Sequence, residues 1–355
     1  MARLSAGQYY TSYHDDEIYV MLQNRFRTGA LIGLLIFFLV LPQVLNSYFV
    51  YIMCLWGIAL IGGIGMSILL GMTGLISLAH GILLMIGGVT AANLVNKLGA
   101  PLWVTIPSAG IVTAFVGAAI GLSAVRLKGF YLALATLAAQ YILYWVLWNW
   151  DTVCGSAGIV LGVPSLFGIS LGDYKRYYYL IFIIAVVLFW AAANLKLTKT
   201  GRAFQAIRDR DIAADLMGIS LPRYKLLSFV MSSFYAGIAG ALLVHMLTLV
   251  PSEYYTLELS IDYLAMILIG GMGSLFGVII GSFFVIIIPI VLESAVSGLP
   301  AIFPFLELGS LVSGSRELFF GLLIMIFLIF EPQGLTKIWT DLFTYFKLWP
   351  FSYER

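Results

Sequence analysis

Residues 48–70 read YFVYIMCLWGIALIGGIGMSILL, an almost wholly apolar stretch without a charged side chain. About 20 apolar residues in a helix cross the hydrocarbon core of a bilayer, so this stretch predicts a transmembrane helix. Similar stretches recur along the chain, whose 355 residues are 61% hydrophobic and 10% charged. A soluble domain carries about 25% charged residues. We therefore expect an all-α polytopic membrane protein. The composition excludes a disordered chain, a coiled coil and a nucleic-acid-binding protein.

Ten stretches of this kind predict about ten transmembrane helices in a domain that covers residues 29–336. The interval 257–295 is long for one helix and short for two, and we divide it at 270–274, where glycines interrupt the apolar pattern. Residues 1–28 and 337–355 flank the domain. The predicted spans are residues 29–46, 48–70, 75–96, 103–124, 130–149, 177–195, 227–250, 258–272, 275–295 and 316–331.

Basic side chains are concentrated in one connection, residues 196–225, which holds seven Lys and Arg against three Asp. Residues 251–262 hold acids and no base. Because basic loops stay on the cytoplasmic side, the first connection is predicted to be cytoplasmic and the second external. Ten spans then place both termini in the cytoplasm. Lys97 and Arg316 fall on the outer side against the rule, and a count of nine spans would move the C-terminal tail outside.

Within the basic connection, residues 198–219 read TKTGRAFQAIRDRDIAADLMGI. We expect two short helices here. Thr200 is predicted to cap the first and Asp211 the second, because short polar side chains accept hydrogen bonds from unpaired N–H groups at helix starts. Gly218 fits the left-handed position that ends a helix, followed by the apolar Ile219.

The second short helix presents a small apolar face. Two pairs of side chains spaced four residues apart form it, namely Ile212 with Leu216 and Ala213 with Met217. One interpretation is an amphipathic helix that lies on the membrane surface, and the other is a helix that docks into a groove of a cytoplasmic protein. A surface helix carries a longer apolar stripe rimmed by bases. Acids alternate with bases here, which favours docking.

A few polar side chains inside the predicted spans are candidates to line a translocation pathway. For each hydroxyl, the alternative is a hydrogen bond to a carbonyl of its own helix. For the histidine, it is a hydrogen bond to a neighbouring helix. His245, near the outer end of its span, is interpreted as an interfacial residue. The candidates are Ser77, His80, Thr136, Ser232 and Ser233.

Glycines spaced four residues apart occur twice in the predicted spans. Gly117 and Gly121 form one pair, and Gly273, Gly277 and Gly281 extend the same spacing. Such glycines permit close contact between helix backbones, so we interpret them as packing positions. Direct contact with a substrate is the alternative.

The sequence predicts no catalytic or metal-binding site, because the residues around each possible motif do not fit it. Residues 168–172 match the G-x-S-x-G nucleophile elbow, which requires a strand before it, a helix after it and a nearby histidine, but they lie in a short predicted loop. Cys54 and Cys154 are far apart and predict no metal site. The sequence has no Walker A motif. It also places no carboxylate in the middle of a span, which weakens the hypothesis of an ion-coupled carrier.

The run GRAFQAIRD at 201–209 resembles the coupling segment of LivM-type permeases, which belong to the branched-chain amino-acid ABC importers. Further motifs occur in the family's order, and together they cover roughly residues 30–336. They are residues 213–214, 217–219, 223–225, 234–242, 257–262, 269–274 and 330–335, with 74–78, 126–133 and 149–151 earlier in the chain.

The resemblance implies a type II-like ABC importer permease, which is not itself an enzyme, in the bacterial inner membrane. Such a permease moves branched-chain or other apolar amino acids by alternating access. Its implied partners are a second related permease, two ABC ATPase subunits that bind ATP and Mg, and a periplasmic substrate-binding protein. This chain would hold no cofactor. The resemblance assigns ATPase coupling to Gly201, Arg202, Phe204, Arg208, Asp209, Ile212, Asp215, Leu216, Met217, Gly218 and Arg223.

The predicted external loop, residues 150–176, is placed to contact the binding protein through Asp151 and Asp173. Two motifs depart from the family pattern. Residues 153–158 read VCGSAG where the family has a Thr-Gly-Gly-like run, and residues 77–84 read SLAHGILL where the family has aromatic side chains. Urea, short amides and organic acids therefore stay open as substrates of the same architecture. An ion-coupled secondary carrier is the alternative mechanism.

Overall fold

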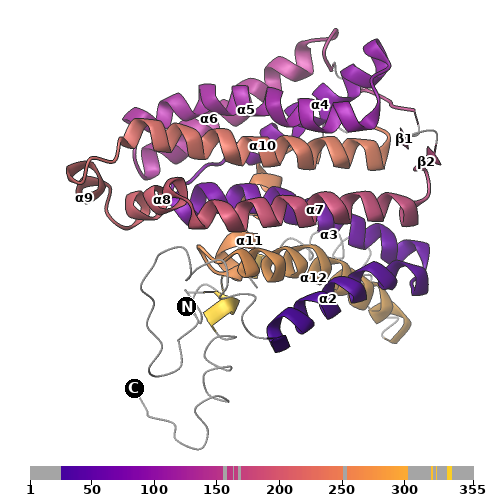
Figure 1. Ribbon diagram of the computed structural model, residues 1–355. Helices are drawn as coiled ribbons and strands as arrows, with labels where there is room; N and C mark the ends of the chain where they lie inside the picture. The colour runs from indigo at the N-terminus through magenta and orange to yellow at the C-terminus, as the bar shows by residue number, and fades with distance from the viewer. Residues whose placement is uncertain are drawn as a thin grey trace, which may run out of the picture.

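The computed structural model (Figure 1) describes residues 25–154, 158–162, 164–166, 169–250, 254–302, 321–322, 325 and 334–337. Residues 1–24, most of the predicted span 316–331 with Arg316, and the tail beyond residue 337 lie outside the described residues.

Long helices make up most of the described chain. A two-stranded antiparallel hairpin of β1 (Ser165–Leu166) and β2 (Ile169–Ser170) lies in the connection before α7. The helices are α2 (Arg25–Val44), α3 (Ser47–Met66), the π-helical turn η1 (Ser67–Met72), α4 (His80–Leu98), α5 (Leu102–Arg126), α6 (Phe130–Asn149), α7 (Tyr174–Leu197), α8 (Lys199–Asp209), α9 (Asp211–Leu216), α10 (Leu221–Leu247), α11 (Leu257–Gly270) and α12 (Leu275–Ile302).

Six helices of the described chain are long and apolar enough to cross a membrane. They are α3 with η1, α4, α5, α6, α7 and α10. Large apolar side chains on α5, α6 and α7, such as Phe115, Trp145 and Trp190, are more than half exposed. A soluble monomer rarely exposes so much apolar surface, whereas lipid tails would cover it. The prediction of a polytopic, membrane-embedded helical protein is confirmed.

The helices form two groups with α3 between them (Figure 1). One group contains α4, α5, α6 and α10, and the other contains α7, α11, α12 and α2. Helices α3 and α10 are mostly buried, while α6 and α7 are mostly exposed. The short helices α8 and α9 lie at one end of the bundle, and β1 and β2 lie at the opposite end. The end of the bundle that carries α8 and α9 is called the coupling end.

Small residues bring the central helices together, as the glycine spacing predicts. A Cβ at Gly117 would overlap Ser233 of α10, and one at Gly121 would press on Phe229. Close approach of α5 to α10 therefore depends on glycine at both positions. The spacing at Gly273, Gly277 and Gly281 is only partly helical, because Gly273 lies in the turn before α12.

The third predicted span does not begin at residue 75. The helix that contains α3 and η1 ends near Gly74, whose φ of +73° only glycine adopts freely, and the chain stays non-helical until His80. Helix α10 also begins earlier than predicted, at Leu221 instead of residue 227, with Pro222 in its first turn. The division of 257–295 into two helices is confirmed, with the turn between Gly270 and Leu275.

Candidate functional site

Helix α8 is held firmly against the bundle. Its apolar face is buried, with Phe204 at 0% exposure and Ile207 at 4%. Thr198 caps the helix, because its hydroxyl accepts a hydrogen bond from the Gly201 N–H at 3.3 Å. The predicted cap at Thr200 is wrong, since the helix begins one residue before it, at Lys199. The first half of the predicted coupling segment therefore acts as an anchor.

Helix α9 presents the opposite arrangement. Ile212, Leu216 and Met217 are 71%, 85% and 85% exposed, so the predicted apolar face is open to its surroundings. Gly218 has a φ of +83° and ends the helix as predicted. Its N–H and that of Ile219 donate to carbonyls of the last turn, which is the usual glycine-terminated arrangement.

Asp211 does not cap α9, contrary to the prediction. Arg210 occupies the cap position without a side-chain hydrogen bond, and Asp211 is the first helical residue. Its carboxylate instead pairs with the Lys128 ammonium at 2.6 Å. The hydrogen bond from Lys128 is the main cause that holds the pKa of Asp211 below its usual value. This ion pair ties α9 to the connection between α5 and α6.

Arg208, in the last turn of α8, reaches back into the bundle. Its Nη1 donates to the Gly71 carbonyl at 2.7 Å, at the end of η1. A neighbouring base, Lys196, donates from Nζ to the Gly273 carbonyl at 2.9 Å. Both bases thus satisfy carbonyls where helices end, which favours cations electrostatically.

Of the remaining predicted coupling residues, some lie where α8 joins the bundle and the others lie on the surface. Gly201 is buried where a Cβ would overlap the Leu195 carbonyl, and Arg202 donates from Nη1 to the Leu197 carbonyl at 3.0 Å. Both lie at the junction of α7 and α8. The side chains of Asp209, Asp215 and Arg223 are exposed at the coupling end.

The start of α4 forms a second polar site, deep in the bundle. His80 Nε2 lies 3.0 Å from the Gly62 carbonyl in the middle of α3. Gly62 is roughly 15 Å along the axis from the end of η1, so the non-helical residues 74–79 run back into the bundle to that depth. Thr136 of α6 accepts from the Leu78 N–H at 2.9 Å. The structure therefore brings together the predicted residues Ser77, His80 and Thr136.

Buried side chains accept hydrogen bonds from the N–H groups that have no partner within the helix at this helix start. Ser77 Oγ accepts from Ala79 at 3.3 Å, Ser260 Oγ from Gly81 at 2.8 Å, and Gln140 Oε1 from Ile82 at 2.9 Å. Gln140 also donates from Nε2 to the Tyr255 carbonyl at 3.1 Å. A carboxylate ligand would have to displace these side chains to bind there. The α4 start is a structural junction of α3, α4, α6 and α11.

Sequence reasoning missed Gln140 and Ser260 in this junction. A signal for Gln140 was present, because an amide in the middle of the span 130–149 is costly unless a buried partner satisfies it. Ser260 carried no such signal, since a serine pairs readily with its own helix.

The other predicted pathway residues lie elsewhere, on α10. Ser232 and Ser233 are fully buried, and among the described residues their hydroxyls have no hydrogen-bond partner. The expectation that they bond to their own helix is therefore wrong. His245 lies in the last turn of α10, at the predicted end of its span, where it is 3% exposed and its Nε2 lies 3.1 Å from Thr105 Oγ1 of α5.

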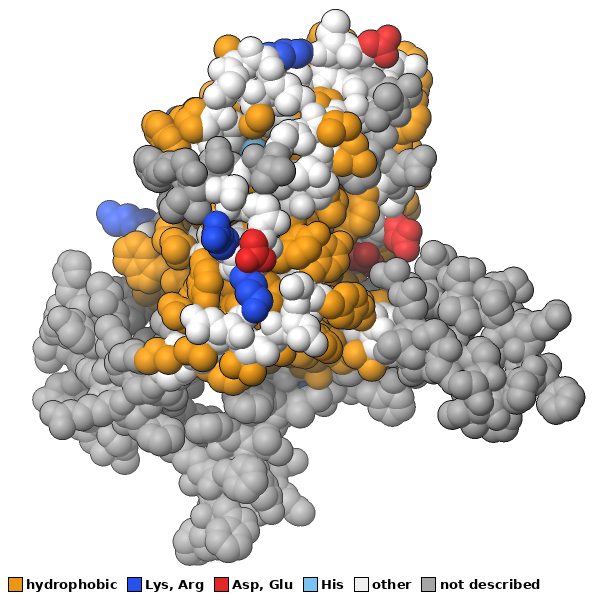
Figure 2. All heavy atoms as spheres, turned by 90° about the vertical axis from the view of Figure 1, so that its right-hand side faces the viewer, with side chains coloured by type: hydrophobic (Ala, Val, Ile, Leu, Met, Phe, Trp, Pro, Cys, Tyr) orange, Lys and Arg blue, Asp and Glu red, His pale blue; other side chains and the backbone are white. Residues whose placement is uncertain are grey.

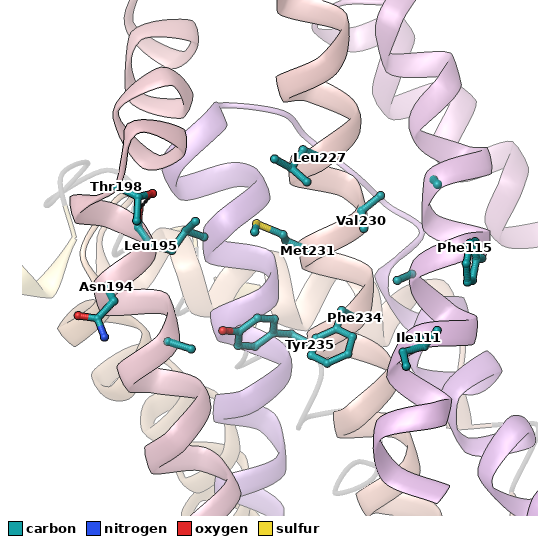
Figure 3. Close-up of a pocket in the computed structure, with 13 residues that line it drawn as sticks. Ile111, Phe115, Asn194, Leu195, Thr198, Leu227, Val230, Met231, Phe234 and Tyr235 are labelled. Atoms are coloured by element: carbon teal, nitrogen blue, oxygen red, sulfur yellow. Dashed lines mark hydrogen bonds between the residues drawn. The ribbon is translucent and has the colours of Figure 1, made fainter. Parts of the chain in front are cut away.

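A cavity of about 730 Å³ opens between α5, α7 and α10 (Figure 3). Each helix contributes residues with the spacing of one helical face. Its polar groups are few, and the Tyr235 hydroxyl is already bonded to the Leu188 carbonyl. An amino acid's charged ends would find little to pair with, and no predicted pathway residue lines the cavity. The lining residues are Ile111, Ala114, Phe115, Ala118, Ala191, Asn194, Leu195, Thr198, Leu227, Val230, Met231, Phe234 and Tyr235.

The predicted external loop is pinned to the end of the bundle opposite α9. Lys97 donates to the Thr152 carbonyl at 2.5 Å, which gives this base a local partner. Asp173 caps α7 by accepting from the Lys175 N–H at 3.2 Å, and Asp151 is exposed in a turn. This end of the molecule shows few charged side chains among apolar and uncharged ones (Figure 2). Within the described residues, no group of side chains suited to a metal ion is found.

Comparison with known proteins places this geometry in a family. The family described as "Branched-chain amino acid transport system / permease component" matches residues 48–329. The chain is 29% identical over 330 residues to the high-affinity branched-chain amino acid transport system permease protein LivM of Escherichia coli, covering 86% of this chain and 74% of LivM.

More distant relatives carry other transport names. The chain is 26% identical over 236 residues to the probable branched-chain amino acid transport permease protein LivH of Methanocaldococcus jannaschii, covering 62% of this chain and 73% of LivH. It is 34% identical over 131 residues to the xylose transport system permease protein XylH of Haemophilus influenzae, covering 36% of this chain and 34% of XylH. No solved structure matches the chain. The match over residues 48–329 shows that the chain belongs to the permease-component family of branched-chain amino acid transport systems.

Proposed function

We propose that the chain is the permease subunit of an ATP-driven ABC importer for branched-chain or other apolar amino acids. One observation carries the proposal beyond the family match. A helix with an exposed apolar face, formed by Ile212, Leu216 and Met217, projects from an anchored helix at one end of a membrane bundle. Exposed apolar faces mark sites of interaction with proteins or membranes, and the alternation of acids and bases around this face favours a protein. A separate ATPase subunit is the partner that this face would receive.

The docking surface would combine α9 with the exposed charges around it. Ile212, Leu216 and Met217 would pack into an apolar groove, while Asp209, Asp215 and Arg223 would set the orientation by charge. ATP and Mg would be bound by the ATPase, and the permease would supply only the contact. Two ATPase subunits, a second related permease and a periplasmic binding protein complete the proposed importer.

The proposed topology has about ten spans, with both termini and α9 on the cytoplasmic side of the inner membrane. The bases of residues 196–225 support this orientation. The helices α2, α11 and α12 and the apolar residues 316–331 supply the spans beyond the six long ones. The opposite end, with Asp151 and Asp173, would then face the binding protein.

The proposed translocation pathway passes the non-helical residues 74–79. Irregular backbone at membrane depth is tolerated only where protein covers it or where it lines an aqueous cavity. Ser77, His80 and Thr136 lie beside this segment, and the unpaired hydroxyls of Ser232 and Ser233 are further candidates. Movement of the segment would open the pathway alternately to each side.

An ion-coupled carrier is a weaker alternative. Such carriers use buried carboxylates, and no Asp or Glu is buried among the described residues, where Lys225 is the buried charge. Urea, short amides and organic acids stay alternative substrates, because the relatives' names show that related permeases serve different solutes.

Two measurements test the proposal. Ile212→Asp with Leu216→Asp should abolish co-purification of the ATPase while membrane insertion is unchanged, because charge replaces the apolar face. Ile212→Val with Leu216→Met keeps the face apolar and should retain the ATPase.

Uptake of labelled leucine in cells should depend on the chain and be competed by isoleucine and valine. Competition by urea or an organic acid alone would replace the amino-acid assignment.

A further inference from the structure

Two glycine-rich turns meet beneath the end of α8, and we call them the glycine junction. The first comprises residues 71–74, after η1, and the second comprises residues 270–273, between α11 and α12. Arg208 lies between them. Its Nη1 donates to the Gly71 carbonyl at 2.7 Å, and the same atom occupies the space that a Cβ at Gly273 would need.

The geometry leaves room for little except glycine at these positions. Gly74 and Gly273 have φ values of +73° and +85°, which other residues adopt at a cost. A Cβ at Gly74 would lie 3.3 Å from Cγ of Arg208. The stem and the head of the arginine therefore both pack on glycine backbone.

Further contacts converge on the second turn. Lys196, at the end of α7, donates to the Gly273 carbonyl at 2.9 Å, and the Thr336 hydroxyl donates to the Gly270 carbonyl at 2.9 Å. The ends of η1, α7, α8 and α11 are thus joined at one place, and Arg208 is the member contributed by the coupling segment.

We propose that Arg208 is a positioning residue that transmits movement of α8 and α9 to the glycine junction, rather than a contact to the ATPase. The proposal rests on the proposed function, because it names how the same coupling segment acts on the spans. Arg208 holds the end of η1, η1 continues α3, and the Gly62 carbonyl of α3 holds His80 at the start of α4. This physical connection runs from the docking helix to the non-helical segment.

The form of the connection favours a movable link. π-Helical turns inside α-helices are rare and often lie at functional sites, and η1 is such a turn. The Arg208 guanidinium can move together with the Gly71 carbonyl, because a hydrogen bond joins the two groups. Contiguity by itself does not establish coupling between two sites, so the proposal depends on a functional measurement.

The test uses the complete importer in vesicles, with this chain, its ATPase, its partner permease and a loaded binding protein. The readouts are ATPase co-purification, ATP hydrolysis and uptake per ATP hydrolysed. In Arg208→Gln we expect normal co-purification and retained hydrolysis, with uptake per ATP reduced at least tenfold. Arg208→Lys should be intermediate, because an ammonium also donates to the Gly71 carbonyl. Lys199→Gln removes a charge from the exposed start of the same helix and should match the wild type.

Two outcomes of the Arg208→Gln experiment contradict the proposal. Loss of ATPase co-purification in Arg208→Gln would make Arg208 an ATPase contact, and uptake per ATP at the wild-type level would remove it from transmission. If Arg208→Gln fails to insert, Arg208→Lys decides, and wild-type coupling in that variant contradicts the link. Absence of ATP-driven uptake in the wild type would instead contradict the proposed function, so the two failures are distinguishable.

Discussion

Gln140 is the residue on which the α4 junction most depends. Its side-chain oxygen and nitrogen serve two backbone groups, the Ile82 N–H and the Tyr255 carbonyl, and the residue is 2% exposed. A buried backbone group that loses its partner costs about 1–3 kcal/mol. Within a membrane the loss is smaller when helices find alternative partners.

Replacing Gln140 by leucine should therefore destabilise the protein by about 1–3 kcal/mol, with a lower thermal-unfolding midpoint in detergent. Gln43→Leu is the matched control, since Gln43 is exposed and its hydrogen bond to Tyr179 is long, at 3.5 Å. An unchanged midpoint in Gln140→Leu would show that the two backbone groups find other partners.

The pair of Lys128 and Asp211 predicts a defined pH dependence. Because the folded pKa of Asp211 is lowered, the pair contributes stability that is fully present above the unfolded-state pKa and is lost as pH falls through the folded pKa. Both groups are partly exposed, so the contribution should stay below about 1 kcal/mol.

A double-mutant cycle with Lys128→Met and Asp211→Asn measures this pair. The coupling energy should be constant from about pH 6 to pH 8, begin to fall below about pH 4, and vanish only when the pH is below the lowered pKa of folded Asp211. A coupling energy that rises toward acid pH would mean that the pair is not an ion pair in solution.

At the scale of elements, α8 and α9 divide the coupling segment into an anchor and a docking helix. Phe204→Ala in α8 should cost about 3–5 kcal/mol, because it empties a fully buried position. Phe115→Ala is the same substitution at a site that is 73% exposed, and it should leave the unfolding midpoint nearly unchanged. Equal midpoints for the two variants would show that α8 is not anchored through Phe204.

The elements also show what the sequence could predict. Apolar stretches long enough to span a bilayer identified the major helices, and the glycines at 270–274 located the turn between α11 and α12. The spans predicted at 48–70 and 75–96 place a break between them, but its extension over residues 75–79 was not predicted, because Leu75, Ile76, Leu78 and Ala79 continue the apolar pattern. Side chains distant in sequence help to satisfy the backbone here, as Thr136 does for the Leu78 N–H and Gln140 for the Ile82 N–H.

The candidate site was predictable to a similar degree. The exposed face of α9 followed from spacing, since Ile212 and Leu216 are four apart. The direction of Arg208 did not, because a charged side chain in a polar loop gives no sign of a backbone carbonyl such as that of Gly71. The caps at Thr200 and Asp211 were each misplaced, because Thr198 accepts from the Gly201 N–H instead and the Asp211 carboxylate pairs with Lys128.

At the scale of the whole molecule, apolar helices make up most of the described chain. Six described helices are suited to span a membrane, and the buried interior of the described chain contains no carboxylate. At one end of these helices, the side chains of Ile212, Leu216 and Met217 are exposed on α9, where we propose that a separate ATPase subunit binds. The central claim is that transport is powered by ATP hydrolysis on a separate chain.

Uptake of labelled leucine into vesicles that contain the complete importer tests this claim most directly. With ATP on the side of the membrane that carries the ATPase subunits and no ion gradient, we expect uptake of leucine. Replacing ATP by a non-hydrolysable analogue should abolish this uptake. Uptake that continues with the analogue and requires only a proton or sodium gradient would contradict the account.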